Sequence, residues 1–187
     1  MYKILKAEKL AANIFLMDVE APRVAKHCLP GQFVIVKMDE EGERIPLTIC
    51  DYDAEKGIVT IVFQPIGAST MKMAELQAGD SFEDFVGPLG KPSEFTEMDL
   101  DELKKKRIVF VAGGVGTAPV YPQVKWLHEH GITADAIVGA KTKDLVILEE
   151  EMSKVCNLYV TTDDGSYVRK GMGTDVLRDL VQNQGKE

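Results

Sequence analysis

An apolar run that leads into a glycine-dense turn constrains this chain more than any other segment. Residues 108–112 (IVFVA) are apolar and rich in β-branched side chains, as in a fully buried parallel strand. The glycines of the next segment, GGVGTAP (113–119), allow a sharp turn, and Pro119 suits the first turn of a helix. Such a turn is typical of a phosphate cradle. A plain strand-to-helix connection is an equal alternative, because the P-loop Lys-Ser/Thr is missing and the spacing departs from G-x-G-x-x-G.

Length and charge narrow the class of protein. The 187 residues suffice for one large or two small domains. No run approaches the ~20 apolar residues that cross a bilayer, and no signal-peptide segment is found, so we expect a cytoplasmic protein without a membrane partner. The net charge of −8 argues against a nucleic-acid partner. Cys28, Cys50 and Cys156 are too far apart in sequence for a disulfide framework or a metal site.

The first half of the chain has the pattern of a small antiparallel barrel. Pro-Gly and Gly-Asp turns separate short strand-like runs, which are residues 14–19, 32–37, 45–51, 58–64 and 81–86. One helix is expected there, over residues 70–76, with Ser69 as its N-cap.

The second half alternates strands with helices, which predicts a doubly wound α/β parallel sheet. Strands are expected over residues 108–112, 134–140 and 158–162, and helices over 120–130, near 148–154 and over 175–183, the last capped by Thr174. The polar segment 92–106 reads as a connector with one short helical turn. We therefore expect domains over residues 1–98 and 99–187, the second incomplete at its C-terminus because three strands make a thin sheet.

Five short motifs in order carry a resemblance to a known family. They are PGQFV (30–34), RIPLT (44–48), GPLG (87–90), GGVGTAP (113–119) and TDDGS (162–166). Together they resemble the ferredoxin-NADP reductase superfamily over nearly the whole chain. Within it the chain is most similar to the flavin subunits of sulfide dehydrogenase and of NADH-dependent ferredoxin:NADP oxidoreductase, with the dihydroorotate dehydrogenase electron-transfer subunit close behind. The resemblance implies an FAD-binding barrel followed by an NAD(P)-binding domain.

The resemblance implies FAD contacts on the strand that begins near residue 45. Arg44 offers a planar fork suited to an FAD phosphate. Thr48, the implied catalytic residue, would donate a hydrogen bond toward the flavin N5 edge, and Pro46 and Leu47 would hold the ring. Without the resemblance, Arg44 would be read as a surface residue of a hairpin.

Further contacts with the FAD pyrophosphate are implied for the next strand and turn. They are Ile61, Val62, Phe63, Gly67, Ser69 and Thr70. Relatives often carry a Gly-x-Gly-Thr-like sequence where this chain has GAST (67–70), a departure that leaves open which of these residues contact the pyrophosphate.

The resemblance also implies a nicotinamide nucleotide site in the second domain. Its residues are Gly113, Gly114, Val115, Gly116, Thr117, Asp164 and Gly165. Asp163 and Asp164 have no acidic or histidine partners at metal-ligand spacing, so no metal is expected there. Lys141 and Lys143 would suit a 2′-phosphate and Asp144 an unphosphorylated ribose, which leaves NAD and NADP both open.

The function that the resemblance implies is electron transfer through FAD between NAD(P)H and an iron-sulfur acceptor of the ferredoxin type, as an oxidoreductase subunit. A second flavoprotein or catalytic subunit is the expected partner. Relatives carry a [2Fe-2S] cluster, for which this chain has no ligands. The alternative is a non-catalytic adaptor subunit that passes electrons within a larger dehydrogenase such as dihydroorotate dehydrogenase.

Overall fold

The structure, a computed structural model, describes residues 1–183. The chain divides into two compact units, Met1–Glu97 and Met98–Glu187. The division lies one residue from the boundary expected at residues 98 and 99.

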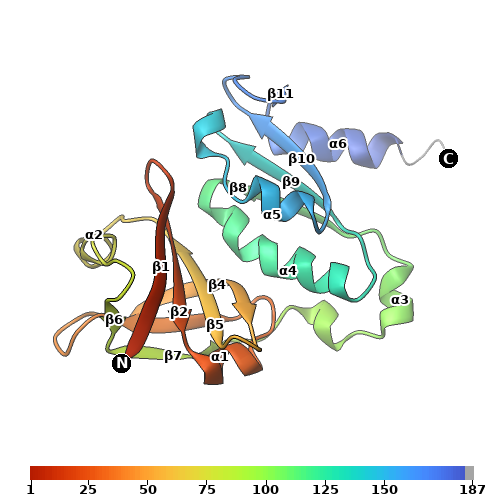
Figure 1. Cartoon of the computed structure of the whole chain (residues 1–187). Coiled ribbons are helices and arrows are strands. Elements are labelled where there is room, and N and C mark those ends of the chain that lie inside the picture. The colour runs from red at the N-terminus through yellow and green to blue at the C-terminus, as the bar shows by residue number, and fades with distance from the viewer. Residues whose placement is uncertain (184–187) are drawn as a thin grey trace. The chain divides into compact units, whose positions relative to one another are not determined.

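The first unit is a nearly closed antiparallel barrel, as expected (Figure 1). Its strands are β1 (Tyr2–Ala11), β2 (Ile14–Glu20), β3 (Phe33–Lys37), β4 (Ile45–Asp53), β5 (Ile58–Phe63), β6 (Ser81–Phe82) and β7 (Asp84–Leu89). They follow one another in the order β6-β1-β2-β5-β4-β3-β7. The two end strands, β6 and β7, are consecutive in the chain, so only one residue separates the two ends of the sheet.

Alternation along each strand divides the barrel wall into an inner and an outer face. Val34 and Val36 are fully buried, whereas Phe33 and Ile35 are half-buried on the outside. The inner side chains join Ile49, Phe82 and other apolar residues in one core. The outer face of β3 and β4 is therefore available to a ligand, while the inner face is filled with side chains.

The short helices of the first unit correct two expectations. Helix α1 (Pro22–His27) was not expected, because six residues show no helical periodicity. Helix α2 (Ala68–Met73) begins two residues before the expected start, so its N-cap is Gly67 and the expected cap Ser69 lies inside the first turn. A 3-10 helix, η1 (Glu94–Glu97), ends this unit.

The second unit contains a parallel sheet, as expected, with strands β8 (Val109–Gly113), β9 (Asp135–Ala140), β10 (Asn157–Thr162) and β11 (Arg169–Lys170). Over the described residues the order is β11-β10-β9-β8. Helices α4 (Thr117–Glu129) and α5 (Glu149–Ser153) lie on one face and α6 (Gly173–Asn183) on the other (Figure 1). A short helix α3 (Leu100–Lys104) and the 3-10 helices η2 (Gly114–Gly116) and η3 (Lys143–Leu145) complete the unit.

Two further expectations for the second unit are wrong. Strand β8 is not fully buried: Val111 is 48% exposed, because β8 lies at the edge of the sheet that residues 98–183 form. Thr174 does not cap α6, since the helix already begins at Gly173. Pro119 does lie in the first turn of α4, as predicted.

Candidate functional site

The motif residues of β4 form a row on the outer face of the barrel. Pro46 and Thr48 are exposed, and Arg44, which immediately precedes the strand, points the same way by alternation. The Arg44 side chain is 60% exposed, and its Nη2 atom lies 3.1 Å from Oδ2 of Asp84 at the start of β7. The structure thus brings three of the predicted FAD contacts to one accessible surface.

Apolar side chains that the sequence did not assign to the site lie beside this row. Phe33 on β3 is paired in register with Thr48 on one side and with Leu89 of β7 on the other. Ile35 is likewise paired with Pro46 and Val86. Residues 33 and 89 fall within two of the motifs, but only the strand register places Phe33 between Thr48 and Leu89. The outer face thus combines an apolar surface with polar groups at its border.

Four predicted contacts have buried or inward side chains. Leu47 packs against the barrel core, and Ile61, Val62 and Phe63 are each at most 7% exposed. The Phe63 ring stacks on Phe15 with centroids 5.8 Å apart. These side chains shape the wall, so any contact they make with a ligand would use main-chain atoms.

The turn between β5 and α2 holds the other predicted phosphate contacts. Thr70 Oγ1 accepts hydrogen bonds from the backbone N–H groups of Ile66 at 2.9 Å and Gly67 at 3.1 Å, so this hydroxyl organises the turn. Ser69 instead directs its hydroxyl outward and donates a hydrogen bond to the Glu43 carboxylate. A Cβ atom added at Gly67 would meet no atom within 4 Å. The turn therefore leaves room for a ligand to approach the backbone.

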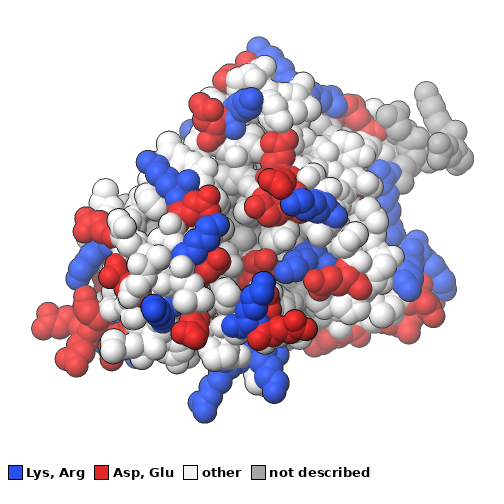
Figure 2. Space-filling model, in the orientation of Figure 1, with Lys and Arg blue, Asp and Glu red and all other residues white. Residues whose placement is uncertain are grey.

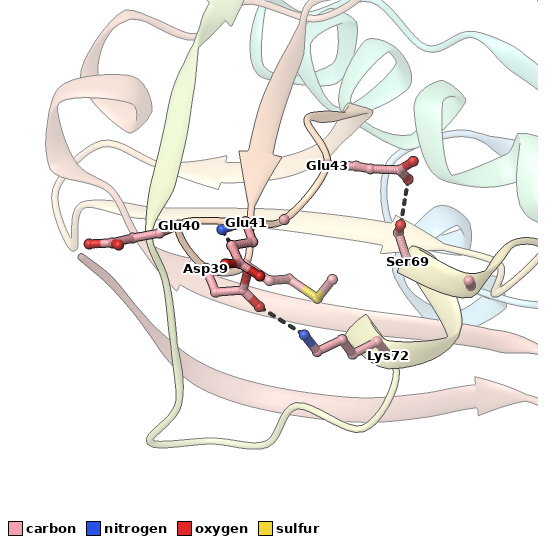
Figure 3. A pocket seen from close by; sticks show the side chains of 9 residues that line it. Asp39, Glu40, Glu41, Glu43, Ser69 and Lys72 are labelled. Carbon is pink, nitrogen blue, oxygen red and sulfur yellow. Dashed lines mark hydrogen bonds and ion pairs between the residues drawn. The ribbon is translucent and has the colours of Figure 1, made fainter.

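A cavity of about 780 Å³ lies between this turn and the β3–β4 loop (Figure 3). Residues 39–43 of that loop, DEEGE, are called here the acidic loop. The acidic loop lines one side of the cavity, and Ala68, Ser69 and Lys72 of α2 line the other. Lys72 Nζ lies 2.8 Å from Asp39 Oδ2, and this hydrogen bond holds the pKa of Asp39 below its ordinary value and that of Lys72 above.

The glycine-rich turn of the second unit has the predicted strand-turn-helix geometry. Gly113 ends β8, residues Gly114–Gly116 form η2, and Thr117 begins α4. Gly114 has φ +53°, which favours glycine, and Cβ atoms added at Gly114 or Gly116 would meet no atom within 4 Å. Val115 is half-buried between them. A ligand can therefore approach the backbone here without a side chain in the way.

Thr117 adds a polar group to this turn. Its side chain is fully buried, and its Oγ1 atom has no hydrogen-bond partner among the described residues. An unpaired buried hydroxyl is costly, and a phosphate oxygen or a water molecule near the helix start would satisfy it. The open glycines and this hydroxyl are chemically suited to a nucleotide phosphate.

The loops after β9 and β10 are tied together at the same edge of the sheet as the glycine-rich turn, because the strands are parallel. Ser166 Oγ accepts a hydrogen bond from the Lys143 backbone N–H at 2.9 Å. Asp164 accepts one from the Ser166 N–H at 2.9 Å, and bonds with Ser166 hold its pKa below the ordinary value. Gly165 follows with φ +76°. Asp164 and Gly165 thus form a turn whose carboxylate is already engaged.

Tyr167, the residue after Ser166, contacts both Glu149 and Lys143. Its hydroxyl donates a hydrogen bond to Glu149 Oε1 at 2.9 Å, which raises the tyrosine pKa, and Lys143 Nζ lies 4.8 Å from its ring centroid. No motif indicated Tyr167 or Glu149, which are 18 residues apart in the chain. A positive charge above an aromatic ring is therefore held next to the loop where the ribose is expected.

Charges of both signs are interspersed over the face shown in Figure 2. Over residues 1–183, no helix is long and apolar enough to cross a membrane.

Comparisons with known proteins find relatives that match nearly the whole chain. No family model matches it. It is 64% identical, over its whole length, to an uncharacterised protein of Clostridium beijerinckii encoded in the adh 3′ region. It is 37% identical over 97% of its length to a homologue of the dihydroorotate dehydrogenase B (NAD(+)) electron-transfer subunit from Thermotoga maritima. The chain spans 64% and 62% of these two relatives.

Solved structures agree with this result. A chain of the NADH-dependent reduced ferredoxin-NADP oxidoreductase, studied for flavin-based electron bifurcation, superposes with a TM-score of 0.87 and 37% identity. The match covers 97% of this chain and 63% of that one. Ferredoxin-NADP+ reductase from Plasmodium falciparum gives a TM-score of 0.69 at 13% identity over 87% of this chain and 70% of that one, which supports the fold alone.

The electron-transfer subunit of dihydroorotate dehydrogenase B from Streptococcus pneumoniae is 33% identical over 95% of this chain and 70% of its own length. These matches confirm the resemblance that the five motifs carry. By sequence and by fold, the chain belongs to the family of dihydroorotate dehydrogenase B electron-transfer subunits, within the ferredoxin-NADP reductase superfamily.

Proposed function

We propose that this chain is a flavoprotein subunit that binds FAD on the outer face of its barrel and NAD(P)H at the glycine-rich turn of its second unit. Electrons would pass between the nicotinamide and an iron-sulfur acceptor on a partner subunit. The observation that carries the proposal is the row of Arg44, Pro46 and Thr48 on an accessible face bordered by the apolar side chains of Phe33 and Ile35. The names of the family members support electron transfer.

The residues of the first unit suit FAD. Arg44 presents a bidentate donor for a phosphate, and its exposed pair with Asp84 is weak enough to be exchanged. The Thr48 hydroxyl would donate a hydrogen bond to the polar edge of a ring that rests on Phe33 and Pro46. The open position above Gly67 would let phosphate oxygens reach the backbone N–H groups at the start of α2.

When bound, FAD supplies the redox chemistry, accepting a hydride and releasing single electrons. The protein's task is to hold two dinucleotides and exclude water. In the second unit, Gly114 and Gly116 leave the backbone accessible to a pyrophosphate, and the buried Thr117 hydroxyl offers it a donor. Asp164 and Gly165 shape the turn beyond β10, and the carboxylate of Asp164 serves that turn. No general acid or nucleophile is needed.

The visible spectrum of the purified chain tests the first step. A bound flavin gives a yellow protein, and reconstitution of the colourless protein with FAD should give a stable one-to-one complex. Rapid mixing of the FAD complex with NADH or NADPH under anaerobic conditions then follows the loss of flavin absorbance. A chain that binds no FAD would refute the proposal.

A second function is favoured by the names of the relatives. Several are electron-transfer subunits, so the chain is also a candidate for an adaptor that exchanges electrons only through a larger dehydrogenase. In that case the FAD complex would keep its absorbance when mixed with NADH or NADPH alone. Reduction would occur only after addition of a reduced catalytic partner subunit.

A further inference from the structure

Three side-chain donors that border the proposed phosphate site of the first unit, on Arg44, Ser69 and Lys72, are each held by a carboxylate. Arg44 pairs with Asp84 at 3.1 Å. Ser69 donates its hydroxyl hydrogen to Glu43. Lys72 pairs with Asp39 at 2.8 Å (Figure 3). The last two acceptors belong to the acidic loop.

The 780 Å³ cavity between the acidic loop and α2 carries an excess of negative charge. Asp39, Glu40, Glu41 and Glu43 line it together with a single cation, Lys72. An anion that entered the cavity with the loop in this position would meet carboxylates on the very groups able to bind it. The cavity suits a phosphate only if the carboxylates withdraw.

Ser69 and Lys72 are arranged to act on one ligand. They are three residues apart on α2, so their side chains emerge on the same side of the helix, and both line the cavity. The Lys72 side chain is 64% exposed and can follow a ligand. Lys72 belongs to none of the sequence motifs, and only its place next to Ser69 indicates a role.

We propose that Lys72 binds the FAD pyrophosphate together with Ser69, and that Asp39 and Glu43 occupy these two donors until the cofactor displaces them. This inference rests on the proposed function and adds to it a phosphate-binding residue and an internal competitor. The acidic loop would thus act as an exchangeable substitute for the phosphate in the flavin-free chain.

The contacts of the acidic loop are suited to exchange. The Lys72–Asp39 pair is exposed on both sides, and exposed pairs contribute little to stability. A phosphate offers several charged acceptor atoms at once, so a single group can engage both Ser69 and Lys72, whereas each carboxylate of the acidic loop engages one of them. Within the loop, Asp39 also accepts a hydrogen bond from the Glu41 N–H at 3.1 Å, so the loop keeps its own turn when it leaves α2.

Neutralising variants test the competition. Glu43→Gln and Asp39→Asn remove the competing charge with little change in shape. Asp39→Asn should tighten FAD binding by up to about fivefold, the upper limit for one exposed ion pair, and Glu43→Gln, whose partner is the Ser69 hydroxyl, should tighten it as well. Glu40→Gln is the matched control, because Glu40 lies on the same loop and lines the same cavity but points away from Ser69 and Lys72 (Figure 3). Lys72→Gln should weaken FAD binding about fivefold.

The assay is the dissociation constant of FAD, measured by flavin fluorescence, with riboflavin as the phosphate-free probe. Riboflavin affinity should be the same in all variants. In the Lys72→Gln background, Asp39→Asn should lose its effect, because the donor it competes for is gone. Thermal unfolding of each flavin-free variant establishes that it is folded.

Three results would overturn the inference and leave the proposed function intact. They are FAD binding that Glu43→Gln and Asp39→Asn leave unchanged, an equal gain from Glu40→Gln, and Lys72→Gln binding FAD as the wild type does. Failure of the wild-type chain to bind FAD at all would overturn both the inference and the proposed function.

Discussion

Two glycines, one in each unit, allow the two proposed dinucleotide sites to be tested separately. Gly67 is the N-cap of α2 with φ −119°, and Gly116 is the N-cap of α4 with φ −63°. Both backbone conformations accept alanine, and a Cβ atom at either position would meet no atom of the protein within 4 Å. Gly67→Ala and Gly116→Ala should therefore change the free energy of unfolding by less than about 1 kcal/mol.

Ligand affinity should respond much more strongly. If a phosphate rests on the backbone above the glycine, the added methyl group removes one charge-assisted hydrogen bond, worth about 1.5–3 kcal/mol. That loss corresponds to a roughly 10- to 100-fold weaker affinity. Gly67→Ala should weaken FAD binding in this range and leave NAD(P)H binding to the FAD-saturated protein unchanged. Gly116→Ala should do the reverse.

Calorimetric titration of each variant with FAD, and of its FAD complex with NADH and NADPH, provides the comparison. Each variant is the control for the other, because both carry the same chemical change at a helix N-cap. A Gly67→Ala protein with unchanged stability and unchanged FAD affinity would show that no phosphate approaches α2. Loss of both ligands in either variant would show that the two sites are not independent.

Three further predictions follow from the side-chain contacts. Asp135 is 5% exposed and accepts hydrogen bonds from the side chains of Arg107 and Asn157. Asp135→Ala should therefore lower the free energy of unfolding, measured by urea titration, by about 3 kcal/mol. Glu150→Gln, which removes an exposed pair with Lys154, should have little effect. Burial raises the pKa of the Cys28 thiol to about 12, so a thiol reagent at pH 8 should modify it only after unfolding. The Lys72 contact lowers the pKa of Asp39, so this contact stabilises the acidic loop at pH values above the ordinary carboxylate pKa and is lost as the pH falls through the lowered pKa. NMR titration of the Asp39 carboxyl group should show the lowered pKa, and a titration midpoint at the ordinary value would contradict the contact.

Much of the fold follows from local patterns in the sequence. Turn residues between short apolar runs predicted most of the barrel strands, and the change to strand-helix alternation predicted the parallel sheet. Strand β1 was missed because most of its residues are exposed, so its sequence, YKILKAEKLA, lacks a regular apolar alternation. The cap of α2 was assigned to Ser69 because serine is a good N-cap, whereas the structure uses Gly67 and lets Thr70 organise the turn.

The site was less predictable because it depends on contacts between distant segments. Arg44 and Asp84 are 40 residues apart, and Glu43 and Ser69 are 26 apart. No feature of the sequence near any of these four residues indicates its partner. Strand register, which places Phe33 next to Thr48, is also fixed by the whole barrel rather than by either strand. The motifs indicated which residue types to consider, and the fold determined which of them lie together.

The two units present their donors to a phosphate in different ways, and this difference has a consequence for affinity. In the first unit, Arg44, Ser69 and Lys72 already have carboxylate partners. A ligand must replace these contacts, so its binding free energy gains only the difference between the new contacts and the ones they replace. In the second unit, the buried Thr117 hydroxyl has no partner among the described residues, so a ligand that reaches it relieves an unsatisfied group. Neutralising a carboxylate should therefore strengthen the first site, whereas replacing Thr117 with valine should weaken the second without loss of stability.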